Sequence, residues 1–136
     1  MYEVRVETNF AAAHFLRDYH GKCERLHGHN YRVFAHVRGA ELDQGGMLLD
    51  FTQLKHALKS VCGALDHTNL NDLPVFDQNP SAERIARYIY DGIIAAMKQE
   101  GTDLSCPADA AAGGRCWLSA VDVFETDTNR ARYMPC

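Results

Sequence analysis

Three histidines and one cysteine early in the chain are the residues best suited to chemistry. His27 and His29 belong to the stretch CERLHGH at residues 23–29, and His14 precedes it. Side chains two residues apart on an extended strand project from the same face, so both imidazoles of this stretch can reach one metal ion. Catalytic zinc usually has three protein ligands and an open position. The pattern therefore predicts a zinc site formed by His14, His27 and His29.

Two predicted strands would place these imidazoles on one surface. In residues 2–14 the even-numbered positions are mostly apolar and end in His14, whereas most odd-numbered positions are charged or polar. From residue 27 the odd-numbered positions carry His27 and His29 and then apolar side chains. Alternation with a period of two is typical of half-buried strands. Both strands are therefore expected to present imidazoles to the inner face of a sheet.

Cys23 has two possible roles beside this site. It could be a fourth ligand that closes a structural zinc site, or a free thiol next to an open one. A nearby cation lowers the pKa of a thiol and makes the thiolate a usable base or nucleophile. The spacing does not decide between these roles, and an inert thiol is compatible with it as well.

Asp66 and His67 form a second candidate group. They follow a predicted helix, where loops present functional groups, and a carboxylate that orients an imidazole is a common device for proton transfer. Adjacent residues rarely bond side chain to side chain, so we expect any relay that includes Cys23 to depend on the fold. The alternative is a histidine that interacts favourably with the end of the helix dipole.

Glu125 is out of character for its position. It continues the expected inner face of a strand, where an unpaired carboxylate is costly. Either the strand end is solvated, or Glu125 accepts hydrogen bonds from a ligand rich in donors, such as the guanidine-like edge of a heterocycle. Arg17, Lys22 and Arg25 lie in a loop and could meet a phosphate-bearing tail, although loop charges are usually solvated.

The predicted elements follow the order strand, strand, helix, helix, strand, strand. Helical spacing predicts one helix after Asp50, with a capping box to Gln53, and a second that begins at residues 79–81. Residues 117–125 alternate again, with Trp117 and Ser119 expected on the face of Glu125, and a turn leads to a strand at 130–134. These segregated elements predict an α+β fold with antiparallel strands and both helices on one face.

The totals limit the class of protein. The chain has 136 residues, five cysteines and a formal net charge of −4. Its length predicts one domain over residues 1–136, and its charge gives no reason to expect nucleic acid or an anionic membrane as partner. We find no signal-peptide pattern and no apolar run that could cross a bilayer, so we expect a cytoplasmic protein.

The cysteines point the same way. An odd number without framework spacing is more typical of a reducing compartment than of a secreted domain. Cys106 and Cys116 flank a Gly/Ala-rich stretch and could pair, but we expect free thiols. We assign no role to the surrounding loop at residues 102–115.

Six segments occur in a characteristic order: FAAAH, CERLHGH, LLDFTQLK, LDHTNLND, NPSAERIARYI and FET. Through them the chain resembles the 6-pyruvoyltetrahydropterin synthase superfamily over nearly its whole length, and most closely its 6-carboxytetrahydropterin synthase branch. The resemblance implies that the three histidines bind zinc. It also implies that Cys23, Asp66 and His67 form a proton-transfer triad and that Glu125 anchors a pterin ring.

The resemblance further implies a fold, an assembly and a reaction. The fold would be the tunnelling fold (ββααββ), whose trimers form β-barrels that stack as a homohexamer with active sites between subunits. The reaction would be the zinc-dependent conversion of 7,8-dihydroneopterin triphosphate to 6-carboxytetrahydropterin in queuosine biosynthesis, with release of acetaldehyde and triphosphate.

Glu24 departs from this pattern. It places an ExxHGH motif, which resembles side-chain lyases of folate synthesis, over the CxxxHGH motif. The alternatives are therefore a 6-pyruvoyltetrahydropterin synthase or a dihydroneopterin side-chain lyase. An alternative of another class is a non-catalytic, zinc-stabilised oligomeric module whose metal site Cys23 closes.

Overall fold

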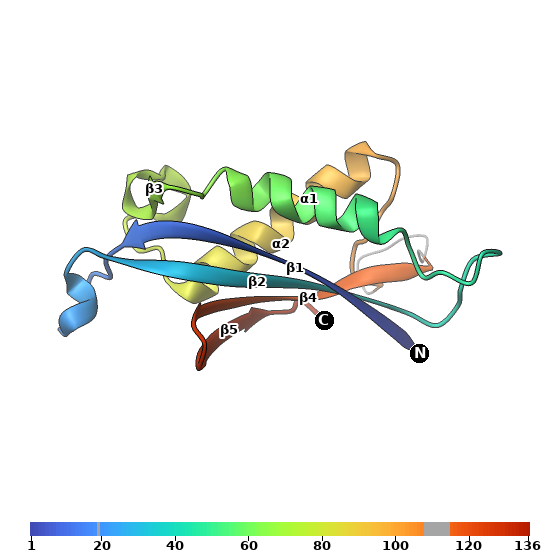
Figure 1. Ribbon diagram of the computed structural model, residues 1–136, viewed down its shortest axis with the longest axis horizontal. Coiled ribbons are helices and arrows are strands. Elements are labelled where there is room, and N and C mark those ends of the chain that lie inside the picture. Colours follow the sequence, from blue (N-terminus) through green and yellow to red (C-terminus); the bar gives the residue numbers. More distant parts are fainter. Residues whose placement is uncertain (19, 108–114) are drawn as a thin grey trace.

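The computed structural model describes residues 1–18, 20–107 and 115–136 of the chain. Its helices and strands are β1 (Tyr2–His14), β2 (His27–Gly39), α1 (Phe51–Gly63), β3 (Thr68–Asn69), α2 (Ala82–Gln99), β4 (Cys116–Thr126) and β5 (Asn129–Tyr133). Three short 3-10 helices are η1 (Lys22–Glu24), η2 (Leu70–Asp72) and η3 (Pro74–Phe76). The strands form one sheet in the order β3-β1-β2-β4-β5, and both helices lie on one face of it (Figure 1).

This architecture confirms the predicted α+β fold with two helices on one face of the sheet. The pairs β1–β2, β2–β4 and β4–β5 are antiparallel. The sheet is mixed rather than purely antiparallel, because β3 pairs in parallel with the end of β1. Sequence patterns did not predict β3, since two residues are too few for an alternation to show.

The first two strands have the predicted phase. Along β1 the residues Val6, Phe10, Ala12 and His14 are buried. β1 and β2 pair over their full length, from Tyr2↔Gly39 to His14↔His27. The alternation therefore turns the imidazole positions and the apolar side chains toward the helices.

The helices cover this face with apolar stripes and begin at the expected caps. The Asp50 carboxylate accepts from the Thr52 N–H at 2.8 Å, and the Ser81 hydroxyl accepts from the Arg84 N–H at 3.3 Å. Both bonds satisfy a backbone donor in the first turn. The fully buried helix residues include Leu54, Leu58, Ile85, Ile89 and Ile93.

The start of β4 differs from its predicted phase. His36 pairs with Ala120 but Val37 pairs with Leu118, so Ser119 is an extra residue on β4. Such a bulge reverses which side chains face the core. Leu118 is therefore fully buried, while Trp117 lines a pocket with His36. The prediction that Trp117 and Ser119 share the face of Glu125 was wrong for this reason.

The cysteine prediction was also wrong in part. Cys106 forms a disulfide with Cys136, whereas Cys116 is free and buried. The fold explains the pairing. The Leu118 N–H donates to the Leu104 carbonyl at 2.9 Å, which holds the segment after α2 beside β4. β5 then returns along β4 and brings residue 136 to that segment.

Two further features complete the fold. Residues 108–114 of the loop predicted at 102–115 lie outside the described residues. Within the part of the chain that the structure describes, no helix is long and apolar enough to cross a membrane.

Candidate metal centre and active site

The structure brings His14, His27 and His29 together at one end of the sheet. Their potential ligand atoms all lie within 4.8 Å of one another, and His14 Nε2 lies 3.0 Å from His27 Nε2. The three ring centroids are 4.6, 5.0 and 4.8 Å apart. Among the described residues this is the one group of three or more side chains that could hold a metal ion. The donor set suits zinc, which binds imidazole nitrogen.

Two backbone carbonyls orient two of the rings. His14 Nδ1 lies 2.8 Å from the Pro80 carbonyl, and His27 Nδ1 lies 2.6 Å from the Arg25 carbonyl. A carbonyl only accepts, so each Nδ1 carries the proton and donates. Each Nε2 is left with a free lone pair, which is how metal-binding histidines are usually prepared.

The third ring supplies direct evidence for an absent group. His29 Nε2 is buried and has no hydrogen-bond partner among the described residues. An orphaned buried nitrogen is costly unless it binds something. Burial also lowers the pKa of His14 and of His29, which favours the neutral imidazole that a metal requires. These residues therefore fit a bound metal ion.

Glu125 lies beside this cluster. Its Oε1 is 3.9 Å from His14 Nε2, and its side chain is a quarter exposed. Against the stronger effect of burial, its negative charge raises the pKa of His14. The carboxylate is thus near the metal position, but one side remains open to a ligand.

Cys23 shares a pocket with Glu125. The pocket has a volume of about 330 Å³, and Ser81, Asn129 and Arg130 also line it. η1 holds Cys23 there, because the Leu16 N–H donates to the Cys23 carbonyl at 2.6 Å. The pocket therefore combines a thiol, a carboxylate and a guanidinium next to the histidine cluster.

Sequence reasoning missed Arg130 and Pro80. Arg130 faces Phe124 across the β4–β5 pair, and only the register of that pair places it beside Glu125. Pro80 acts through its backbone carbonyl, 66 residues from His14 in the sequence. A backbone carbonyl has no residue-specific signal in the sequence.

Asp66 and His67 bond directly, which corrects our expectation for adjacent residues. His67 Nδ1 lies 2.9 Å from Asp66 Oδ2. The left-handed backbone of His67, with φ of 58°, folds its ring back toward the carboxylate. The Ala11 N–H donates to Asp66 Oδ1 at 2.9 Å, and with the His67 bond it lowers the pKa of that carboxyl. Asp66 is therefore an ionised, fixed partner that orients His67.

His67 does not share a pocket with Cys23 in the described structure. It lines a second hollow of about 550 Å³ with His29 and Asn30, and its side chain is 82% exposed. The imidazole thus projects outward from the chain that carries it.

The charged residues in and around η1 differ in their contacts: some form hydrogen bonds within the chain and others are exposed. The Glu24 carboxylate accepts from the His20 N–H at 2.7 Å and lines a different pocket from Cys23. Arg17 donates to the Gln78 side chain at 3.0 Å. Lys22 and Arg25 are exposed. The structure therefore places the Cys23 thiol and the Glu24 carboxylate in different pockets.

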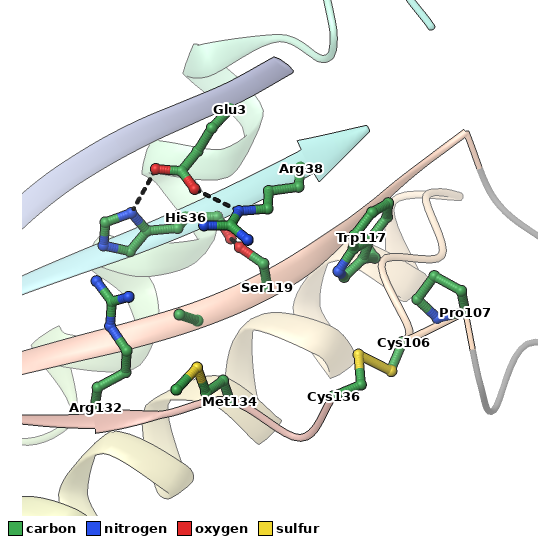
Figure 2. A pocket seen from close by; sticks show the side chains of 11 residues that line it. Glu3, His36, Arg38, Cys106, Pro107, Trp117, Ser119, Arg132, Met134 and Cys136 are labelled. Atoms are coloured by element: carbon green, nitrogen blue, oxygen red, sulfur yellow. Dashed lines mark hydrogen bonds and ion pairs between the residues drawn. A yellow bond between two sulfur atoms is a disulfide. The ribbon is translucent and has the colours of Figure 1, made fainter. Parts of the chain in front are cut away.

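A second ionisable cluster lies on the opposite face of the sheet and was not predicted. His36 Nε2 donates to Asp122 Oδ2 at 2.8 Å, and its Nδ1 lies 3.4 Å from Glu3 Oε1. Arg132 binds both oxygens of Asp122, at 2.6 and 2.8 Å, and Arg38 Nε donates to Glu3 at 2.6 Å. Figure 2 shows Glu3 between His36 and Arg38, in a pocket of about 230 Å³. We call these five residues the outer-face network.

The chain resembles proteins of one known family in its sequence. The profile of the 6-pyruvoyl tetrahydropterin synthase family matches residues 3–136. A 6-carboxy-5,6,7,8-tetrahydropterin synthase of Bacillus subtilis (strain 168) is 42% identical over 102 residues, which are 71% of this chain and 68% of that protein. The enzyme of the same name from Synechocystis is 35% identical over 98% of this chain and 93% of its own length.

A solved structure extends the comparison to the fold. The 6-pyruvoyl tetrahydropterin synthase of Caenorhabditis elegans superposes with a TM-score of 0.78 and 26% identity. The match covers 99% of this chain and 96% of the other. The family profile, the related sequences and the shared fold agree, and the chain therefore belongs to the 6-pyruvoyl tetrahydropterin synthase family of enzymes.

Proposed function

We propose that the chain converts 7,8-dihydroneopterin triphosphate and one water molecule to 6-carboxytetrahydropterin, acetaldehyde and triphosphate, in the biosynthesis of queuosine. The observation that carries this proposal is the three-histidine cluster, with its orphaned nitrogen, beside a pocket that Cys23 and Glu125 line. The names of the Bacillus and Synechocystis relatives favour the carboxy product. The reaction would take place in the cytoplasm.

The histidine cluster and Glu125 would bind the two ends of the reacting part of the substrate. Zinc held by the three histidines would polarise the side-chain hydroxyls and acidify the adjacent C–H bonds as a Lewis acid. Glu125 would accept two N–H groups from the guanidine-like edge of the pterin, a bidentate pairing that also fixes the orientation of the ring. The open side of Glu125 suits that role.

Cys23 would act as the base at the substrate side chain. Its thiol lines the pocket that Glu125 also lines, so it is within reach of a pterin held there. A bound cation would favour its thiolate form. Glu24, which faces a different pocket and accepts from the His20 N–H, is less well placed for this step.

His67 would transfer a second proton, and it would do so in the active site of a neighbouring subunit. Its Nδ1 is held by Asp66, so its other ring nitrogen is the one that exchanges protons. Because the exposed ring lines a different hollow from Cys23, we propose that it completes the site of an adjacent chain in a homohexamer of two stacked trimers. This assembly would close the sheets into barrels.

The product decides between the branches of the family. Purified zinc-loaded protein is incubated with 7,8-dihydroneopterin triphosphate, and the pterin is identified by mass spectrometry. We expect 6-carboxytetrahydropterin together with acetaldehyde. A 6-pyruvoyl or 6-hydroxymethyl pterin as the main species would refute the proposed product and point to the synthase or the folate-type lyase.

Cys23→Ala separates an enzyme from a non-catalytic zinc module in the same assay. If Cys23 is the base, the variant loses about 100- to 10,000-fold in turnover and keeps its full zinc content. If Cys23 were a fourth ligand of a structural site, zinc content and melting temperature would fall together, and the proposed role of Cys23 would be wrong.

A further inference from the structure

Asn71 is a buried polar residue that the proposed chemistry does not use. It is 4% exposed and lies in η2, five residues after Asp66. Its Oδ1 accepts from the Phe15 N–H at 2.9 Å. Its Nδ2 donates to the Phe15 carbonyl at 3.0 Å and to the Gln78 carbonyl at 3.2 Å. The side chain therefore binds the backbone of two segments, one of them 56 residues away, through three hydrogen bonds.

Each of these backbone groups adjoins a residue of the metal site. Phe15 directly follows His14, so both polar groups of that peptide segment are fixed next to a metal-binding ring. Gln78 lies two residues before Pro80, whose carbonyl orients the same ring. Asn71 thus holds the strand that carries His14 and the segment that orients His14 in one relative position.

The same contacts extend toward the thiol. Phe15 is followed by Leu16, whose N–H donates to the Cys23 carbonyl at 2.6 Å. The segment that begins at Asp66 is bound at its start to Ala11 of β1 and at Asn71 to Phe15, the residue that follows β1. A displacement at residue 71 would therefore be transmitted to Cys23 as well as to His14.

Only a carboxamide matches this environment. An amide supplies one acceptor and two donors, and all three are used here. Alanine would leave one N–H and two carbonyls without this partner in a partly buried place, and aspartate could accept from Phe15 but would lack the donors. The position therefore requires a carboxamide for its hydrogen bonds, and not merely a side chain of the right volume.

We propose that Asn71 is a positioning residue of the metal centre, which sets the place of His14 relative to the Pro80 carbonyl and to the Cys23 loop. This inference rests on the metal site put forward above, but it does not depend on the substrate or on the product. Metal affinity therefore tests it separately from the reaction.

The test compares Asn71→Ala and Asn71→Asp with Ser119→Ala as a matched control. Ser119 is also buried, and its hydroxyl donates to the His36 carbonyl at 3.1 Å, but on the opposite face of the sheet. Zinc affinity is measured by competition with a chromophoric chelator, at a temperature where circular dichroism shows each variant folded. The visible absorption of the cobalt-substituted protein reports the geometry of the site.

We expect Asn71→Ala to lower zinc affinity by about tenfold, as the loss of other outer contacts of metal ligands does. Asn71→Asp should lower it less, and both should alter the cobalt spectrum. Ser119→Ala should leave affinity and spectrum unchanged. If Asn71→Ala does not fold, Asn71→Asp gives the same comparison.

Two results would overturn the inference. One is wild-type affinity and an unchanged cobalt spectrum in the Asn71 variants. The other is wild-type protein that binds neither metal, which would remove the site itself. Wild-type protein that binds zinc and fails to convert the pterin would refute the proposed function and leave this inference to be decided by the affinities.

Discussion

The histidines on the two faces of the sheet differ in whether their ring nitrogens are paired with protein groups. On the face toward the helices, His14, His27 and His29 converge, and a buried nitrogen of His29 has no partner among the described residues. On the other face, both ring nitrogens of His36 and both oxygens of Asp122 lie against partners. Buried polar groups are nearly always paired, so an unpaired one indicates a missing ligand. The histidine cluster therefore has an atom free to bind a ligand, whereas in the outer-face network His36 and Asp122 are already satisfied by protein groups.

The largest expected effect comes from removing a ligand of the first cluster. His29→Ala should lower zinc affinity by at least about 100-fold, because loss of outer contacts alone costs 10- to 100-fold. His36→Ala removes an imidazole of the same kind from the outer-face network and should leave zinc affinity unchanged. Zinc bound per chain, measured by mass spectrometry of the metal after dialysis, compares the two. Loss of zinc in His36→Ala would abolish the distinction between the clusters.

An intermediate effect is expected at the centre of the outer-face network. Asp122 is 4% exposed and is bound by Arg132 and His36. Asp122→Asn removes the charge that these donors share, which should cost about 2 to 3 kcal/mol of unfolding free energy. Urea denaturation followed by circular dichroism measures it. Zinc affinity of the folded variant should stay at the wild-type value.

The same residue predicts a dependence on pH. Burial opposes ionisation of Asp122, but the hydrogen bonds from Arg132 and His36 outweigh it and lower its pKa. Arg130 at 3.8 Å and the neighbouring Glu3–Arg38 pair complete the charges around it. A lowered folded pKa stabilises the protein above the unfolded value of about 3.9, and this contribution is lost as pH falls below it. In Asp122→Asn the free energy of unfolding should therefore depend less on pH in this acidic range. An unchanged pH dependence would contradict the assignment.

The smallest effect is expected at the exposed edge of the network. Glu3 and Arg38 are 40% and 50% exposed at their side chains. Ion pairs at this exposure contribute about 0 to 1 kcal/mol, so Glu3→Gln should shift the urea midpoint only slightly. High salt should reduce the difference further. A loss as large as that of Asp122→Asn would mean that the network acts as one unit rather than around a buried centre.

Sequence patterns predicted the features that depend on the alternation of side chains along a strand or on residue type at a helix start. Alternation in β1 and β2 placed His14, His27 and His29 on one face, and the antiparallel register then set His14 opposite His27. Helix caps at Asp50 and Ser81 follow from residue type close to the helix start. These signals are local, so they are readable without the fold.

The remaining features depend on contacts that no local pattern contains. The extra residue at Ser119 reverses the phase of β4 only because β2 pairs as it does. The Cys106–Cys136 pair needs β5 to return along β4. The outer-face network was overlooked because His36 falls at a position where alternation predicts a solvated side chain, although the fold buries it.

The register between β1 and β2 has a consequence for how the protein selects its native pairing. The strands are joined by residues 15–26, which is too long a connection for a tight turn to fix their alignment. A slip of one residue would expose the apolar face, but a slip of two would preserve it and displace the strands by about 7 Å. In one direction such a slip sets His14 opposite Arg25, away from both His27 and His29, so the three imidazoles could no longer share one ion. Metal binding would then stabilise the native register of β1 and β2 relative to this slipped pairing.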